Sequence, residues 1–161
     1  MTQPSDQKVE QQWDTPSYEE IPEITKGHVA AMEGSDADEV WNVAGMQHIL
    51  IETVGRKSGT THKIALPTWT DPEGRRIVAA SFAGHPNHPA WFLNLRDRKE
   101  PELRCRVQGK SFWSAPEILD GDEYERIWEL FTADRAWYVD YQAKTDRRIP
   151  LVRLPETRPA D

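Results

Sequence analysis

The amino-acid sequence predicts an α+β protein, a small and mainly antiparallel β-barrel of about six strands with flanking helices. Three observations support this prediction: six short strand-like segments, a strong hairpin signal between two of them, and one clear amphipathic helix. The chain has 161 residues, enough for one ordinary domain and too few for two of typical size.

The strand prediction depends on turn signals and on side-chain alternation. The sequence Asp-Pro-Glu-Gly at 71–74 is a hairpin signal between two apolar segments. In the segment 102–108, Leu103, Cys105 and Val107 fall on one face and polar side chains on the other, as in a half-buried strand. We expect strands over 48–54, 63–70, 75–82, 102–108, 111–119 and 148–154.

Helices are predicted by spacing and by capping residues. After Asp120, apolar side chains recur at i, i+3, i+4 and i+7 and form one stripe, which predicts an amphipathic helix. Asp36 followed by Glu39 resembles an N-cap with its capping partner and predicts a short helix that stops at Gly45. Pro89 is expected at or near the first turn of a further helix.

The net charge of −7 is distributed unevenly along the chain. Residues 1–40 contain ten acidic residues and two lysines, so this segment carries −8 and the remainder +1. The net charge argues against nucleic acid as a partner, because that binding depends on clustered cations. We expect four regions: a flexible acidic tail at 1–16, a helical extension at 17–45 with interruptions at Pro22 and Gly27, a barrel domain at 46–155, and a C-terminal tail at 156–161.

Cys105 is the only cysteine, so no intramolecular disulfide can form, and a reducing, cytoplasmic location is expected. The longest apolar runs have four residues. A bilayer-spanning helix needs about 20, so no integral membrane segment is expected.

A glycine-rich, basic loop is expected at 55–63, between two predicted strands. Its sequence Gly-Arg-Lys-Ser-Gly-Thr-Thr-His-Lys offers backbone N–H groups, hydroxyls and fixed cations, which suit a ligand carrying phosphate or carboxylate groups. The spacing differs from that of a P-loop. A solvated hairpin turn explains the same composition equally well, because such turns are often basic and rich in glycine.

Two further segments are candidates for a site. Residues 80–91 lead from a strand end into a helix N-terminus, which is a common place for ligands. His85 and His88 are too few ligands for a metal site, so no metal is expected.

Tyr138 and Tyr141 share one helical face, and phenols beside a pocket can donate a proton. Two half-buried tyrosines of a surface helix are the alternative. The sequence contains no Gly-x-Ser-x-Gly nucleophile motif.

These three segments carry a family resemblance. They read Gly-Arg-Lys-Ser-Gly after an apolar strand, Ala-Ser-x-x-Gly followed by His-Pro-Ala-Trp-Phe-Leu-Asn-Leu, and Asp-Tyr-Gln-x-Lys-Thr-Asp-Arg-x-Ile-Pro-Leu. In this order, over residues 46–154, they resemble the deazaflavin-dependent nitroreductase family. The resemblance implies a split β-barrel related to the FMN-binding barrels, and coenzyme F420, an 8-hydroxy-5-deazaflavin with an acidic lactyl-phosphate and oligoglutamate tail.

The resemblance also implies roles for individual residues. Tyr138 and Tyr141 match substrate-facing tyrosines that position the acceptor and supply a proton, and no protein nucleophile is needed because the coenzyme carries the difficult step. The implied coenzyme-binding residues are Arg56, Lys57, Ser58, His62 and Lys63 for the acidic tail, and Ala80, Ser81 and Trp91 for the deazaflavin ring.

This chain departs from the family pattern at three positions. His62 stands where an arginine is common, and Phe82 stands where a nitroimidazole-activating relative has a lysine. Arg135 aligns with a further tyrosine of that relative. The identity of the substrate is therefore not carried over.

The resemblance predicts an F420H2-dependent reductase that transfers hydride to a small, hydrophobic, electron-poor acceptor: a quinone, an enone or unsaturated lipid, or a nitroaromatic. The alternatives are a non-catalytic protein that binds or carries F420, and a split barrel that binds a flavin such as FMN, or haem. A homodimer is left open as the assembly.

Overall fold

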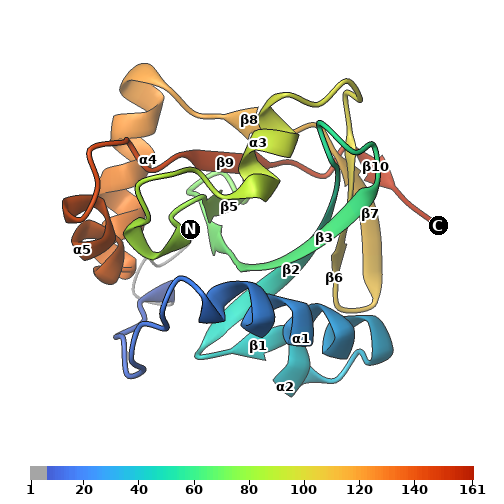
Figure 1. Ribbon diagram of the computed structural model, residues 1–161, viewed down its shortest axis with the longest axis horizontal. Helices are drawn as coiled ribbons and strands as arrows, with labels where there is room; N and C mark the ends of the chain where they lie inside the picture. Colours follow the sequence, from blue (N-terminus) through green and yellow to red (C-terminus); the bar gives the residue numbers. More distant parts are fainter. Residues whose placement is uncertain (1–6) are drawn as a thin grey trace.

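The computed structural model describes residues 7–161, which form two antiparallel sheets with helices around them (Figure 1). The helices are α1 (Glu20–Gly34), α2 (Asp38–Trp41), α3 (Ala90–Arg96), α4 (Gly121–Asp134) and α5 (Trp137–Ala143), and η2 (Phe82–Gly84) is a 3₁₀ turn. The strands are β1 (Asn42–Val43), β2 (Met46–Val54), β3 (Thr61–Pro67), β4 (Trp69–Thr70), β5 (Arg76–Ala79), β6 (Leu103–Val107), β7 (Lys110–Ser114), β8 (Glu117–Ile118), β9 (Leu151–Leu154) and β10 (Arg158–Pro159).

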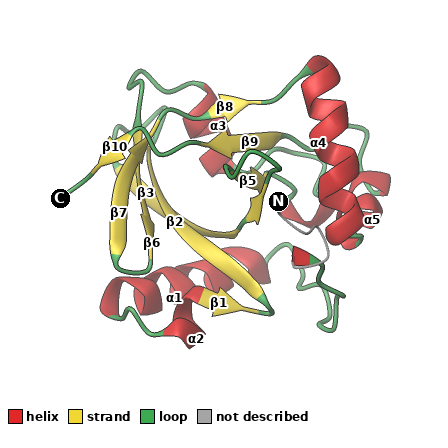
Figure 2. Ribbon diagram, turned by 180° about the vertical axis from the view of Figure 1, so that it is seen from behind, coloured by secondary structure: helices red, strands yellow, loops and turns green. Residues whose placement is uncertain are grey.

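The α+β class and the six predicted strands are confirmed. They correspond to β2, β3 with β4, β5, β6, β7 with β8, and β9. The predicted strands at 63–70 and 111–119 are each divided in two, because the chain passes from one sheet to the other within them, and β1 and β10, which lie outside the predicted segments, have two residues each. One sheet has the order β1-β2-β6-β7-β10, with β3 also paired to β2, and the other has the order β4-β5-β9-β8 (Figure 2). The hairpin turn at 71–74 joins β4 to β5, as predicted.

The chain passes between the two sheets at three short connections, and these make the sheets into a split barrel. The connections join β3 to β4, β7 to β8, and β9 to β10. At the first of them, Thr68 donates from its backbone N–H and from its hydroxyl to the carbonyl oxygen of Gln47, over 2.8 and 2.9 Å. These two hydrogen bonds to β2 fix the point at which the chain leaves the first sheet.

Apolar side chains from both sheets meet in the barrel core. The alternation predicted for 102–108 is confirmed, because Leu103, Cys105 and Val107 are buried there. Helix α3 contributes Phe92 and Leu95 to the same cluster and so covers part of the barrel. Burial raises the pKa of the Cys105 thiol to about 12, so this thiol stays protonated and unreactive.

The other helices cover the outer faces of the sheets. Helices α4 and α5 pack on the smaller sheet through one cluster, which includes the predicted stripe of α4. Helices α1 and α2 pack on the outer face of β2 and β3 (Figure 1). The expected interruptions of α1 are absent: Pro22 lies in the first turn, where its missing N–H is not needed, and Gly27 faces open space.

The predicted helix from Asp36 to Gly45 is wrong beyond Trp41. Helix α2 is followed by β1, and Ala44 and Gly45 form the two-residue turn of the β1–β2 hairpin with φ angles of 55° and 78°. Two left-handed residues match the twist of paired strands, and this stabilises the hairpin against continuation of the helix. Asp36 is not a cap but forms an ion pair with Arg106 at 2.5 Å.

The third predicted strand is too long, because β5 ends at Ala79. Phe82 and Ala83 have φ angles of 44° and 51°, which extended backbone does not allow, and they form the turn η2 instead. The contacts of these residues are described with the candidate site below.

Residues 7–16 belong to the expected flexible tail, but in the structure they lie against the barrel. Gln7 exchanges two side-chain hydrogen bonds with the backbone of Thr70, at 2.7 and 2.8 Å. The Val9 N–H donates to the carbonyl oxygen of Asp134, and the Trp13 ring packs edge-on to Trp137. A few anchoring contacts therefore order this polar segment, although its composition alone predicts a flexible chain. Residues 1–6 of that tail lie outside the described part of the chain.

Among residues 7–161, no helix is both long enough and apolar enough to cross a bilayer.

Acidification is expected to destabilise the fold through His48. This side chain is buried below α1, with Nδ1 2.9 Å from the carbonyl oxygen of Met46 and its ring 4.9 Å from that of His28. Burial lowers the pKa of His48 from 6.5 to about 4, so folding favours the neutral ring. The contribution of neutral His48 to the free energy of unfolding is fully present above about pH 6.5. As the pH falls toward 4 the unfolded state takes up a proton that the folded state does not, and about 3 kcal/mol of this free energy is lost in total.

Urea unfolding at pH 7 and pH 4.5 tests this expectation. Between the two values the wild type should lose about 2–3 kcal/mol more than the His48→Gln variant, which has no group to protonate there. Equal losses in both proteins would contradict the buried, neutral state of His48.

Candidate functional site

The basic loop between β2 and β3 is a closed turn. The Gly55 N–H donates to the carbonyl oxygen of Thr60, and the Gly59 N–H donates to that of Gly55, both over 2.8 Å. A Cβ atom on Gly55 would collide with the hydroxyl oxygen of Ser58 and lie 3.0 Å from Nε2 of His62, so a larger residue there would push these two side chains aside. The loop thus has a defined shape, while its two basic side chains, Arg56 and Lys57, are exposed.

Asn94 of α3 holds the start of this loop. The side-chain oxygen of Asn94 accepts hydrogen bonds from the backbone N–H of Arg56 at 3.2 Å and from its Nη1 at 3.1 Å. Asn94 is only 5% exposed, so it is a fixed support. Sequence reasoning missed this residue, although it is the asparagine of the His-Pro-Ala-Trp-Phe-Leu-Asn-Leu motif.

Hydroxyl groups connect the loop to His62. Ser58 Oγ lies 2.8 Å from Thr60 Oγ1, which lies 3.2 Å from Nε2 of His62. The Ser58 hydroxyl therefore has partners within the loop and shapes it. Among residues 7–161, no acidic group lies within 4.0 Å of the cations of Arg56 or Lys57, so their charges are available to a ligand.

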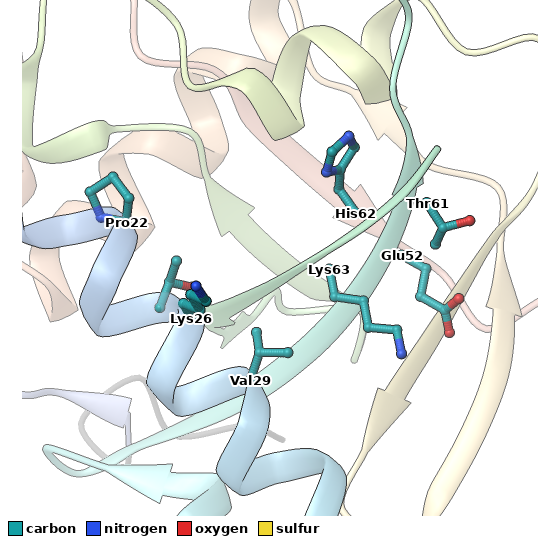
Figure 3. Close-up of a pocket in the computed structure, with 8 residues that line it drawn as sticks. Pro22, Lys26, Val29, Glu52, Thr61, His62 and Lys63 are labelled. Carbon is teal, nitrogen blue, oxygen red and sulfur yellow. The ribbon is translucent and has the colours of Figure 1, made fainter. Parts of the chain in front are cut away.

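Lys63 lies apart from the other predicted tail-binding residues. Figure 3 shows His62 and Lys63 leaving β3 on opposite sides, as alternate residues of a strand do. Lys63 Nζ pairs with Glu33 of α1 at 2.5 Å, and this hydrogen bond raises the pKa of Lys63. Lys63 is therefore engaged by an acidic partner on α1, whereas no such ion pair is formed by Arg56 or Lys57 within residues 7–161.

A cavity of about 600 Å³ lies between α1 and the start of β3 (Figure 3). Helix α1 contributes Lys26 to its wall, and β3 contributes His62 and Lys63. The remaining lining residues are Pro22, Thr25, Val29, Glu52 and Thr61. This cavity adjoins the basic loop and has more basic than acidic side chains on its walls.

The second predicted segment begins at the end of β5. Ala80 is fully buried, and its N–H donates to the carbonyl oxygen of Pro150 over 2.9 Å. The carbonyl oxygens of Ala80 and Ser81 accept hydrogen bonds from Arg147, at 3.1 and 2.7 Å. Arg147 was also missed, although it is the arginine of the third motif.

Trp91, which the resemblance places beside the deazaflavin ring, lies in the barrel core. It is 8% exposed and belongs to the apolar cluster between the sheets. Its bulk therefore supports the strand end from within the barrel. The half-exposed aromatic side chain in this segment is Phe82, whose ring stacks on His85 at 4.7 Å, with Tyr18 edge-on to both rings.

Tyr138 and Tyr141 lie side by side on α5, as their spacing predicts. Their ring centroids are 5.6 Å apart, and the side chains are 6% and 8% exposed. Burial raises the pKa of Tyr138 to about 12 and also raises that of Tyr141. Both phenols therefore keep their protons at neutral pH and can donate hydrogen bonds. The Tyr141 hydroxyl lies 3.3 Å from Thr15 Oγ1.

Gly84 brings the strand-end turn against α5. Its φ angle is +83°, and a Cβ atom there would lie 2.6 Å from the backbone oxygen of Tyr141. Together with the Arg56–Asn94 bonds, this contact links the basic loop, α3, the turn after β5 and α5 into one band. The three predicted segments are thus brought together.

The substitution Gly84→Ala is expected to lower the free energy of unfolding by about 2 kcal/mol. A Cβ atom there would collide with the backbone of Tyr141, and alanine is strained at the positive φ angle of this position. Thermal or urea unfolding measures it. Gly27→Ala is the matched control: Gly27 is helical and faces open space, so a small stabilisation is expected there. Equal effects of the two substitutions would contradict the close contact.

Comparison with known proteins identifies the family. The family described as F420H(2)-dependent quinone reductase matches residues 24–156. The chain belongs to this family. The resemblance to deazaflavin-dependent enzymes is thereby confirmed, under the quinone reductase name.

Curated F420H(2)-dependent quinone reductases are similar to this chain over about two thirds of its length. The F420H(2)-dependent quinone reductase Rv1261c of Mycobacterium tuberculosis is 29% identical over 107 residues, which are 66% of this chain and 71% of the relative. The putative F420H(2)-dependent quinone reductase Rv3178 of the same organism is 27% identical over 106 residues, 66% of this chain and 87% of the relative.

Two solved structures show the same fold. The F420-H2 dependent reductase FDR-A is 30% identical with a TM-score of 0.56, over 67% of this chain and 93% of that one. A structure described as a domain-swapped dimer is 27% identical with a TM-score of 0.60, over 85% of this chain and 98% of that one. These matches support the split barrel and coenzyme F420, and they give no support to the FMN alternative.

The residues of this quinone reductase family member fit F420. An acidic tail needs accessible cations, and Arg56 and Lys57 are exposed and form no ion pair within 4.0 Å among residues 7–161. The predicted ring residues Ala80 and Ser81 lie at the end of β5, where Arg147 bonds the carbonyl oxygens of both. Helix α5, which carries Tyr138 and Tyr141, meets the turn after β5 at Gly84, through the backbone oxygen of Tyr141.

Proposed function

We propose that this F420H2-dependent reductase transfers hydride to a quinone, and that the band of linked segments is its active site. The family match over residues 24–156 is the observation that supports the proposal most strongly. Enones, unsaturated lipids and nitroaromatics are the other acceptors of the same electron-poor, hydrophobic class.

Each part of the band has its own role in this proposal. Reduced F420 supplies the hydride. Arg56 and Lys57 bind the acidic tail, and Asn94 holds the loop that presents them. The backbone of Ala80 and Ser81 receives the ring.

The two tyrosines complete the reaction at the acceptor. A quinone that accepts a hydride must also take up a proton to become a hydroquinone. Tyr138 and Tyr141 carry their protons at neutral pH, and burial raises the pKa of both phenols further. Either can hydrogen-bond the acceptor oxygen and donate its proton as the hydride arrives, and the tyrosinate that results regains a proton from solvent before the next turnover. Their burial also limits water around the reacting atoms.

Stopped-flow or steady-state oxidation of F420H2 by the purified protein tests the proposal. A panel of naphthoquinones, benzoquinones, cyclic enones and nitroaromatics should give fastest oxidation with the quinones. Absence of oxidation with every acceptor, by a folded protein that binds F420, would favour a binding or carrier protein instead.

The basic loop gives a sharper test. Lys57→Glu is expected to weaken F420 binding about 5- to 150-fold, the equivalent of about 1–3 kcal/mol for a charge-assisted hydrogen bond. The measurement is fluorescence titration of the coenzyme. Lys99→Glu makes the same charge change at an exposed residue after α3 and should leave the affinity nearly unchanged. Equal affinities of the two variants would make the loop an ordinary turn.

Two further proposals concern the surroundings of the enzyme. A second copy of the chain is the proposed partner, since the relative described as a domain-swapped dimer covers 85% of this chain. Light scattering of the purified protein tests this. A cytoplasmic location is proposed on the single, buried Cys105, and fractionation of the source cells tests it.

A further inference from the structure

The turn after β5 has an unfavourable backbone conformation. Phe82 and Ala83 are consecutive non-glycine residues in the left-handed region, with φ angles of 44° and 51°. Side chains with a Cβ atom avoid this region, and such conformations persist only where surrounding contacts fix them. The contacts that fix this turn are therefore informative.

Arg147 provides these contacts from the loop that follows α5. Its guanidinium donates to three carbonyl oxygens: that of Ala80 at 3.1 Å, that of Ser81 at 2.7 Å, and that of His85 at 2.8 Å. The first two precede the left-handed pair and the third follows it. One planar side chain thus holds both ends of the turn.

The position of Arg147 is itself fixed. Its backbone oxygen accepts a 2.8 Å hydrogen bond from Gln142 of α5, and its N–H donates to Thr145 at 3.3 Å. The turn after β5 and the helix that carries the two tyrosines are therefore locked to each other through one residue.

The charge of Arg147 is compensated by carbonyl dipoles. No acidic group among residues 7–161 lies within 4.0 Å of it. His88 Nδ1 lies 3.3 Å from Nη1, and this nitrogen must be unprotonated to accept that hydrogen bond. Burial and then the charge of Arg147 lower the pKa of His88, in agreement with this arrangement.

We propose that Arg147 is a positioning residue for the coenzyme, which fixes the backbone of Ala80 and Ser81 in the conformation that receives the deazaflavin ring. The inference rests on the proposed function, in which these two residues contact the ring. Without the guanidinium the turn relaxes from its left-handed conformation, and coenzyme binding must then order it again.

Chemical rescue of Arg147→Ala tests this role. The Kd for oxidised F420 is expected to rise at least tenfold, and millimolar guanidinium should restore most of the affinity because the cavity left behind matches it. Arg148→Ala is the matched control, since Arg148 is adjacent in sequence and stacks over Tyr124 at 4.0 Å, away from the turn. A Kd unchanged in Arg147→Ala, or raised equally in Arg148→Ala, or raised without any rescue, would overturn the proposal.

NMR titration of His88 in the wild type and in Arg147→Ala, both without coenzyme, provides a measurement that does not depend on F420. A pKa below the ordinary 6.5 is expected in the wild type, and it should rise in Arg147→Ala because a nearby positive charge is removed. An equal pKa in both proteins would show that burial alone lowers it and that Arg147 and His88 do not meet. If the wild type did not bind F420 at all, the proposed function would fail, whereas this titration would still report on the Arg147 contacts.

Discussion

Replacing Arg153 by methionine is expected to lower the free energy of unfolding by about 3–5 kcal/mol, because it removes one partner of a buried ion pair. Arg153 of β9 is 4% exposed, and its Nε donates to Oδ2 of the fully buried Asp71 at 2.9 Å. Among residues 7–161, the Asp71 carboxylate would retain Arg75, with Nε at 3.2 Å, as its one cation within 4.0 Å. Urea unfolding at pH 7 measures the loss.

The loss of stability should be large only for the buried ion pair. Arg96→Met breaks the exposed pair with Asp97 and is expected to cause no measurable change. The double variant Asp71→Asn/Arg153→Met should lose less than the sum of the two single variants, because the second change removes a charge that the first has left unpaired. Strictly additive losses would contradict the buried pair.

The strands of this fold are predictable from the sequence because local signals mark them. The alternation around Cys105 and the Asp-Pro-Glu-Gly turn depend on neighbours within a few residues. The errors arise where distant contacts decide the conformation. Nothing near Trp13 in sequence indicates that it packs on Trp137, and the end of β5 depends on the hydrogen bonds from Arg147, more than 60 residues away.

In the candidate site, too, the features with local sequence signals were predicted and those that depend on distant contacts were not. Residue type and spacing placed Tyr138 and Tyr141 on one face of a helix, and the structure agrees. Spacing could not show that Lys63 turns away from the basic loop toward Glu33, since that requires the orientation of β3 relative to α1. Asn94 was missed because a neutral side chain inside an apolar helix carries no local signal of its hydrogen bonds to a loop.

Tyr141→Phe is expected to reduce kcat/KM for the quinone by about 10²-fold or more, the usual contribution of a positioned general acid. Tyr141 is 8% exposed, and its hydroxyl has Thr15 Oγ1 at 3.3 Å as its hydrogen-bond partner among residues 7–161. Phenylalanine retains the packing against Tyr138 and removes only the O–H group. The Kd for F420 should therefore change less than twofold, and the loss should appear in steady-state kinetics with the acceptor.

The pH dependence and a control variant distinguish proton donation from packing. Burial raises the pKa of Tyr141, and a phenol with a raised pKa keeps its proton to higher pH, so its contribution should persist to at least pH 10. Thr15→Val removes the partner of the Tyr141 hydroxyl without removing the phenol, and it should lower kcat/KM far less than Tyr141→Phe. If Thr15→Val had the larger effect, the N-terminal segment rather than the phenol would control the reaction. If Tyr141→Phe kept full activity, the proton would have to come from Tyr138, and Tyr138→Phe would then show the 10²-fold loss.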